Sequence, residues 1–240
     1  MSLWSISHRL GEEVANLQFA SPVTHVYNPL AYAADPHRQY LDRYGKGTPE
    51  VLLLGMNPGP WGMAQTGVPF GEVNAVQDWL AIDGQVGRPS QEHPKRPVTG
   101  FACARSEVSG RRVWGWAADR FKTPERFFER FFIGNYCPLI FLEESGRNRT
   151  PDRLSKTERS SLFEICDRAL VDLVTHLSPK KVIGFGRFAE NRALAALADA
   201  PVGAQIEIGR ILHPSPASPA ANAGWAEQIE KQLVDQGIRL

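Results

Sequence analysis

Short apolar runs alternate along the chain with longer segments whose apolar residues recur every three to four positions. The clearest run, residues 51–54, lies between a proline and a glycine and is typical of a strand buried on both faces of a parallel sheet. The clearest periodic segment follows a capping box formed by Ser155 and Glu158, and it predicts an amphipathic helix that ends near Leu177. Further strands are predicted at 131–134, 181–185 and 206–212.

Helices are predicted between and around these strands. They are expected around 10–17, from Asp35 as N-cap with Pro36 in the first turn, around 73–80, from Thr123, over 188–197, and from Ser218 through a stretch that carries Trp225, Ile229 and Leu233. Residues 83–115 are rich in Gly, Pro, Arg and Ser without a clear period and predict a long excursion of the kind that is often functional. The alternation predicts an α/β fold, a three-layer α/β/α sandwich around a central, mostly parallel four-stranded sheet, in a single domain over residues 1–240.

Composition and charge are typical of a globular protein. Hydrophobic residues make up 42% of the chain and charged residues 22%, which argues against a disordered or fibrous protein. The formal net charge is +1, so basic residues must be clustered if the partner is an acidic polymer. Because no apolar run approaches the roughly 20 residues that cross a bilayer and no signal segment begins the chain, we expect an intracellular protein without a membrane partner. The scattered Cys103, Cys137 and Cys166 form no Cys-x-x-Cys pair, and we expect neither disulfides nor a metal or other cofactor.

Polar residues stand directly after three of the predicted strands. In an open parallel sheet ligands bind beyond the carboxyl ends of the strands, where Asn57, Asn135 and His213 are expected to meet. An asparagine amide can hold a water or read the edge of an amide-like ring, and a histidine can donate to a developing oxyanion. The plainer interpretation is that asparagine favours turns and that a lone histidine is an ordinary loop residue.

Several familiar motifs are missing from the sequence. There is no Gly-x-x-x-x-Gly-Lys-Ser/Thr run, and the glycines at 55 and 59 lack the third glycine of a dinucleotide site. There is also no Gly-x-Ser-x-Gly elbow and no His-Glu-x-x-His segment. These absences disfavour kinases, dehydrogenases, esterases and zinc proteases.

The segments around the candidate residues resemble a known family. Residues 55–73, which read GMNPGPWGMAQTGVPFGEV, resemble almost residue for residue the first motif of the single-strand-selective monofunctional uracil-DNA glycosylases. Residues 213–216, together with Asn222, Gly224 and Trp225, are similar to the second motif of that family. Segments 106–110, 135–139 and 145–148 match in order between the two motifs, so that the resemblance covers roughly residues 51–225.

The resemblance implies the uracil-DNA glycosylase fold and hydrolysis of the N-glycosidic bond of a damaged pyrimidine that has been flipped out of the DNA stack. In that reading Asn57 holds the attacking water, and His213 donates to the uracil O2 as negative charge builds on the leaving base. Main-chain N–H groups around Met56 and Gly59 would add donors to the same charge. The product would be an abasic site.

The resemblance also implies how the base is recognised. Asn135 would read O4 and N3–H, and Phe70 would stack on the ring, although an aromatic residue at this position could equally be a core residue. Gly59 stands where the uracil-only family carries a tyrosine that blocks the pyrimidine 5-position. The pocket is therefore expected to admit 5-substituted uracils such as 5-hydroxymethyluracil.

Two segments are expected to grip DNA. One is the basic stretch 145–159, where Arg147 and Arg149 are the expected phosphate contacts, although a charge run is also typical of plain solvated surface. The other is the loop after His213, which would wedge into the duplex and whose expected contacts are Pro214, Ser215, Pro216 and Ala217. The chain departs from the vertebrate pattern in this loop, because Ala217 stands where an arginine is usual, and Trp61 stands where phenylalanine is common.

Three other readings remain open at the level of the sequence. A related glycosylase that prefers deaminated purines, such as xanthine or hypoxanthine, would keep nearly the same motifs. A protein that binds lesions without turnover would keep the pocket but leave the bond intact. An iron–sulfur member of the superfamily is disfavoured by the scattered cysteines. We expect the protein to act as a monomer. A DNA glycosylase is expected in the nucleoid region of the cytoplasm in a bacterium or in the nucleus of a eukaryote.

Overall fold

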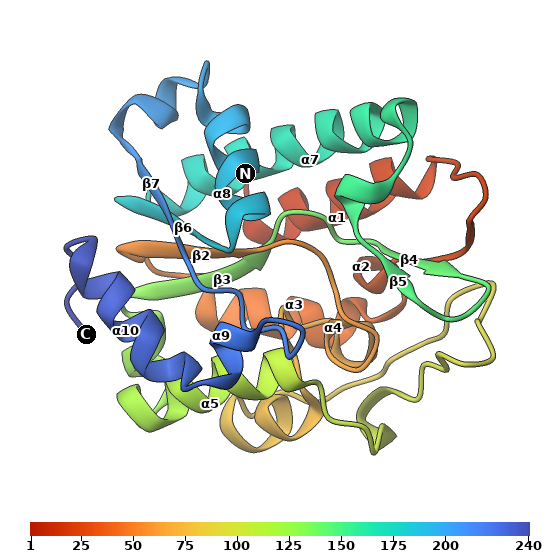
Figure 1. Ribbon diagram of the computed structural model, residues 1–240, viewed down its shortest axis with the longest axis horizontal. Helices are drawn as coiled ribbons and strands as arrows, with labels where there is room; N and C mark the ends of the chain where they lie inside the picture. Colours follow the sequence, from red (N-terminus) through yellow and green to blue (C-terminus); the bar gives the residue numbers. More distant parts are fainter.

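The computed structural model describes residues 1–240 and has a four-stranded parallel sheet at its centre (Figure 1). Its strand order is β3-β2-β6-β7, and every neighbouring pair is parallel. The four strands are β2 (Val51–Gly55), β3 (Phe131–Asn135), β6 (Lys181–Phe185) and β7 (Glu207–Ile211). The predicted three-layer α/β/α fold with a central parallel sheet is confirmed, because all four predicted strands form within one or two residues of their expected ends.

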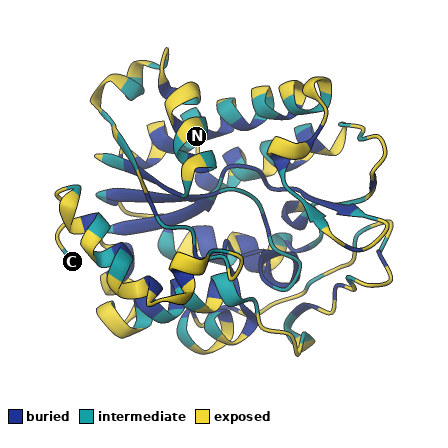
Figure 2. Cartoon of the chain, viewed as in Figure 1, coloured by how far each residue is buried: buried dark blue, intermediate teal, exposed yellow.

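Helices cover both faces of the sheet. Every residue of β2 is buried, as its unbroken apolar run predicts for a central strand (Figure 2). On one side lie α1 (Leu3–Ala15), α7 (Lys156–Leu177) and α8 (Arg187–Leu197), and on the other α5 (Val108–Phe121), α6 (Pro124–Phe128) and α10 (Trp225–Asp235) (Figure 1). α3 (Ala34–Tyr44) lies beside the edge strand β3, where the Tyr40 hydroxyl donates to the Ile133 carbonyl at 2.8 Å.

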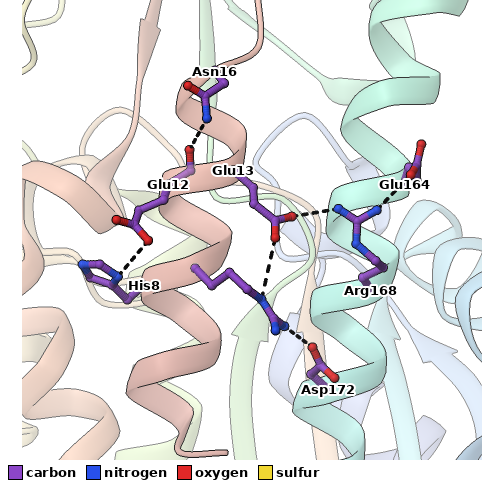
Figure 3. A network of polar contacts seen from close by, with 8 residues as sticks. His8, Glu12, Glu13, Asn16, Glu164, Arg168 and Asp172 are labelled. Carbon is purple, nitrogen blue, oxygen red and sulfur yellow. Dashed lines mark hydrogen bonds and ion pairs between the residues drawn. The ribbon is translucent and has the colours of Figure 1, made fainter.

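The predicted capping box begins the longest helix. The Ser155 hydroxyl accepts from the Glu158 N–H, and the Glu158 carboxylate accepts from the Ser155 N–H at 2.9 Å. On its outer side α7 is tied to α1 by ion pairs of Arg9 with Asp172 and of Arg168 with Glu13 (Figure 3). Since these charges are partly exposed, each pair contributes at most about 1 kcal/mol, and the buried apolar faces hold the two helices together.

A second, antiparallel sheet was not predicted from the sequence. Its order is β1-β4-β5, with β1 (Val23–Tyr27), β4 (Ile140–Glu143) and β5 (Asn148–Arg149). β1 has a mixed burial pattern and β5 only two residues, so neither carries a readable period. The turn between β4 and β5 contains Gly146 at φ +82°, a left-handed conformation that favours glycine.

Several predicted helix boundaries are wrong. The helix expected from Asp35 begins one residue earlier, at Ala34, and the Asp35 carboxylate instead accepts from the Gln85 N–H at 2.9 Å, which anchors the long excursion. That excursion ends at Val108, where α5 begins. The helix expected around 73–80 does form over residues 73–79, and most of it is the π-helical segment Ala75–Trp79. Ser218 caps the short α9 (Pro219–Asn222), and Trp225 starts a separate helix.

The remaining short elements connect these parts. They are α2 (Pro29–Tyr32), α4 (Met63–Thr66) and three 3-10 segments at Gly100–Ala102, Pro151–Arg153 and Pro201–Gln205. No helix is both long enough and apolar enough to cross a membrane.

Candidate active site

A cavity of about 270 Å³ lies where the loops after β2, β3 and β7 converge. This is the edge at which an open parallel sheet binds its ligands. All six residues predicted to act on the base line the cavity, namely Met56, Asn57, Gly59, Phe70, Asn135 and His213. Strand ends that are 78 residues or more apart in sequence thus bring the two asparagines and the histidine together.

Asn57 is held in one orientation by the loop after β3. Its Nδ2 donates to the Leu139 carbonyl at 3.1 Å. The two loops are also joined by main-chain bonds from the Tyr136 N–H to the Gly55 carbonyl and from the Cys137 N–H to the Met56 carbonyl, both 2.9 Å. Because the amide nitrogen is engaged, Asn57 has its acceptor Oδ1 free for the cavity.

Phe70 has a backbone conformation that few non-glycine residues adopt. Its φ is +54°, and its side chain is 9% exposed. The ring packs 4.8 Å from that of Phe185, and the preceding Pro69 carbonyl accepts from the indole N–H of Trp114. Such strain persists only where the surroundings hold it, and it concentrates at functional sites.

Gly55 allows the base-reading asparagine and the aromatic ring to approach the end of β2. A Cβ at this position would lie 2.2 Å from the Asn135 Oδ1 and 2.7 Å from the Phe70 ring. The Asn135 Nδ2 donates one hydrogen to the Met63 sulfur at 3.3 Å, which fixes the plane of the amide. One N–H and the Oδ1 of Asn135 therefore remain for a ligand.

His213 is neutral and has a defined tautomer. Burial lowers its pKa from 6.5 to about 4. Its Nδ1 accepts from the Ser215 N–H at 3.0 Å, so the ring proton is on Nε2. The imidazole is thus a neutral N–H donor at pH 7, and not an imidazolium acid.

Glu107 lines the same cavity and was given no role in the sequence analysis, although it lies in one of the matching segments. Its carboxylate accepts from the Trp61 N–H at 3.1 Å and from the Gly62 N–H. Burial without a cationic partner raises its pKa to about 7. Neither periodicity nor spacing marks this residue, because it precedes α5 at the end of the aperiodic excursion.

The loop after β7 is braced by an arginine of α5. Arg112 donates to the Pro214 carbonyl at 2.9 Å and to the Asn222 Oδ1 at 2.8 Å. At the tip of the loop Pro216 and Ala217 are exposed, whereas Pro214 is buried and Ser215 lines the cavity. The predicted wedge residues therefore divide into two that face solvent, one that is buried and one that lines the cavity.

The two arginines predicted to contact phosphates differ in their surroundings. Arg147 is exposed at the turn between β4 and β5. Arg149 donates to the Glu143 carboxylate at 2.9 Å and to the Arg153 carbonyl. Arg147 is the freer of the two for a phosphate.

The side chains contain no group of three or more His, Cys, Asp or Glu residues that could hold a metal ion.

The sheet, with two amides and a neutral imidazole at the carboxyl ends of its strands, has the architecture of a base-excising glycosylase. The model of the uracil DNA glycosylase superfamily matches residues 42–233. The structure is also similar to that of wild-type SMUG2 from Pedobacter heparinus, with a TM-score of 0.70 at 18% identity over 99% of this chain and 97% of that one, a likeness of fold.

Curated relatives are similar over nearly the whole chain. The single-strand selective monofunctional uracil-DNA glycosylase of Rattus norvegicus is 53% identical over 96% of this chain and 82% of its own length. The protein of the same name from Bos taurus is 51% identical over 96% of this chain and 84% of its own length. The chain belongs to the uracil-DNA glycosylase superfamily and, within it, to the single-strand selective monofunctional family.

Proposed function

We propose that this protein is a monofunctional DNA repair glycosylase that excises uracil and 5-substituted uracils by hydrolysing the N-glycosidic bond and leaves an abasic site. The observation that carries the proposal is the neutral His213, whose Nε2–H donor shares one cavity with the Asn57 and Asn135 amides. Family membership supports the same reaction. The binding of deaminated purines or of lesions without turnover is not favoured by any feature of the site.

His213 acts on the leaving base in this mechanism. As the N-glycosidic bond breaks, negative charge builds on the uracil O2, and a fixed N–H donor stabilises it without having to transfer a proton. The low pKa of His213 suits this role, because an imidazole that stays neutral across the physiological pH range keeps Nδ1 as the acceptor for the Ser215 N–H, and this bond holds the Nε2 donor in place. Removal of one such donor typically costs about 10²–10³ in rate.

Asn57 holds the attacking water through its Oδ1. An amide is a poor general base, so bond breaking must run ahead of water attack, and the water needs to be positioned more than activated. The hydrogen bond from Asn57 Nδ2 to the Leu139 carbonyl keeps the acceptor in place. The chemistry therefore depends chiefly on charge stabilisation at O2.

Asn135 and Phe70 select and hold the base. The free N–H of Asn135 donates to O4 and its Oδ1 accepts from N3–H, a pattern that matches uracil and opposes cytosine. The Phe70 ring, fixed against Phe185, stacks on the base after flipping.

The DNA strand is held on both sides of the cavity. The exposed tip of Pro216 and Ala217 contacts the duplex on one side, and Arg147 contacts a phosphate on the other. Beside the cavity runs a groove of about 610 Å³ whose lining includes Lys95, Arg96, Arg105 and Trp61. Cations around an aromatic ring suit a single strand, whose phosphates and bases they can bind together.

We infer that a monomer is the acting unit, because the proposed reaction assigns no role to a residue of a second chain. Size-exclusion chromatography with light scattering, with and without DNA, tests this. A dimer that persists at assay concentration would contradict it.

A single gel tests the activity. An oligonucleotide with one uracil is treated with the protein in excess chelator and then with hot alkali, and strand cleavage only after the alkali is expected. Intact strands after alkali would leave a lesion-binding protein, and cleavage before alkali would contradict a monofunctional mechanism, in which no lysine forms a Schiff base with the sugar.

A further inference from the structure

The cavity wall at Gly59 is formed by a carboxyl group. A Cβ built on Gly59 would lie 1.9 Å and 2.2 Å from the two oxygens of Glu107. The Glu107 carboxyl therefore occupies the space that a side chain at position 59 would take, and it faces the same cavity as Asn57, Asn135 and His213. The sequence predicted open space in the pocket at Gly59, whereas the structure has a polar carboxyl group there.

Glu107 has no cationic partner to neutralise it. Its hydrogen bonds come from the main chain, from the N–H groups of Trp61 and Gly62. The other titratable group that lines the cavity is His213, and the Arg105 guanidinium lies over the Trp61 ring at 4.5 Å. A carboxyl in this situation keeps lone pairs available on the cavity side, and a ligand with a hydroxyl donor would satisfy one of them.

We propose that Glu107 is a specificity-determining residue that reads the substituent at the 5-position of the flipped pyrimidine, accepting a hydrogen bond from a hydroxymethyl group. The inference rests on the proposed function, because it uses the base orientation with O2 at His213 and O4 at Asn135. In that orientation C5 lies across the ring from C2 and next to C4, so it points away from His213 toward the wall of Gly59 and Glu107. A hydroxyl there gains a partner, whereas the methyl group of thymine strips solvent from the carboxyl and returns nothing.

The same wall discriminates between donors and acceptors. An ionised carboxylate only accepts, so it favours a 5-hydroxymethyl group over a 5-formyl group, whose oxygen is an acceptor. A protonated carboxyl also donates, and it can bind the formyl oxygen. Burial raises the pKa of Glu107 to about 7, so the preference is expected to change within the range of an ordinary assay.

Glu107→Gln separates this role from a structural one. The amide keeps the size of the side chain and an acceptor for the loop N–H groups, and it adds a donor that does not titrate. Single-turnover rates of wild type and variant are compared on matched oligonucleotides with uracil, 5-hydroxymethyluracil, 5-formyluracil and thymine, and each rate is divided by that on uracil. We expect the formyl-to-hydroxymethyl ratio to rise about tenfold in Glu107→Gln at pH 8.

The pH profile gives a second readout. In wild type the formyl-to-hydroxymethyl ratio should rise as pH falls through about 7, whereas in Glu107→Gln it should follow only the titration of the substrates, which both enzymes share. Equal changes on all substrates, with matching pH profiles, would overturn the proposal and leave Glu107 as a support for the loop. Failure of wild type to release uracil would instead overturn the proposed function, so the two failures are distinguishable.

Discussion

The loops after β2 and after β7 both carry a reacting group, yet they are built in opposite ways. The loop after β2 is almost entirely buried from Gly62 to Glu72 and is tied by main-chain bonds to the loop after β3. The loop after β7 is largely exposed beyond Ser215 and is held from outside by Arg112. The buried loop after β2 can position a water and a base, whereas the exposed loop after β7 can contact DNA. His213 lies at the start of the exposed loop and also lines the cavity.

The largest expected effect concerns the groups that these two loops bring together. His213→Ala and Asn57→Ala should each lower the single-turnover rate on uracil by about 10²–10³-fold, because both stabilise the transition state. Affinity for a non-hydrolysable uracil analogue in DNA should change far less. Equal losses of rate and affinity would recast both residues as binding groups.

The rigid loop is expected to depend on pH through a buried histidine. His37 is 5% exposed, donates from Nδ1 to the Gly67 carbonyl at 2.7 Å and contacts the Ser7 hydroxyl through Nε2, also at 2.7 Å. Burial lowers its pKa from 6.5 to about 4. Between these values the unfolded chain takes up a proton that the folded chain does not, so stability falls as pH falls, by up to about 3 kcal/mol near pH 4.

His37→Asn tests this account, since its amide can still donate to the Gly67 carbonyl but does not titrate. The free energy of unfolding in urea is measured at pH 7, 6 and 5 for both proteins. The variant is expected to be less stable at pH 7 but to lose less stability on acidification. Parallel pH curves would show that His37 does not couple this loop to protonation.

Close packing at Gly59 predicts that substitutions at Gly59 and at Glu107 are coupled in their effect on stability. Gly59 is not among the glycines with positive φ, so alanine fits its backbone, but the added Cβ would displace the Glu107 carboxyl from the Trp61 N–H. Gly59→Ala should cost about 1 kcal/mol of unfolding free energy for the lost bond to a partly buried donor. In a Glu107→Ala background the same substitution should cost clearly less unfolding free energy. Urea denaturation of the wild type, the two single variants and the double variant measures this difference. If the losses of the two single variants add up in the double variant, the added Cβ clashes with another group.

Some parts of the fold and of the site were predictable from the sequence, and others were not. The β2 strand and the α7 capping box were predictable, because an unbroken apolar run and a Ser-x-x-Glu pair act locally. The meeting of Asn57, Asn135 and His213 followed from the rule for parallel sheets. Glu107 and Arg112 were not predictable as site residues, because their roles arise from contacts 46 and 102 residues away in sequence.

The exposed loop should respond to loss of its brace by a smaller amount. Arg112→Ala removes two hydrogen bonds to the loop, which are worth about 1 kcal/mol net, so the single-turnover rate on duplex uracil is expected to fall roughly fivefold through looser positioning of His213. Arg111→Ala is the matched control, because this neighbour is exposed and its guanidinium donates to the Ser106 hydroxyl, at 3.4 Å, and not to the loop. Similar losses in both variants would mean that general charge, and not the brace, is responsible.

The smallest expected effect tests whether the exposed tip touches DNA at all. Ala217→Arg adds a cation at the exposed tip of the loop, and an exposed ion pair is worth about 0.2–1 kcal/mol, so affinity for uracil duplex should rise only a few fold. A more sensitive readout is the salt dependence, because each added phosphate contact steepens the slope of log K against log salt by about 0.9. Val234 is 57% exposed and lies in the last turn of α10, whose end is next to the C-terminus in Figure 1. Val234→Arg adds the same charge as a control and should leave the slope unchanged. If both variants steepen the slope equally, the added charge acts through the electrostatic field of the whole protein. That result would contradict a contact between the tip of the loop after β7 and the duplex.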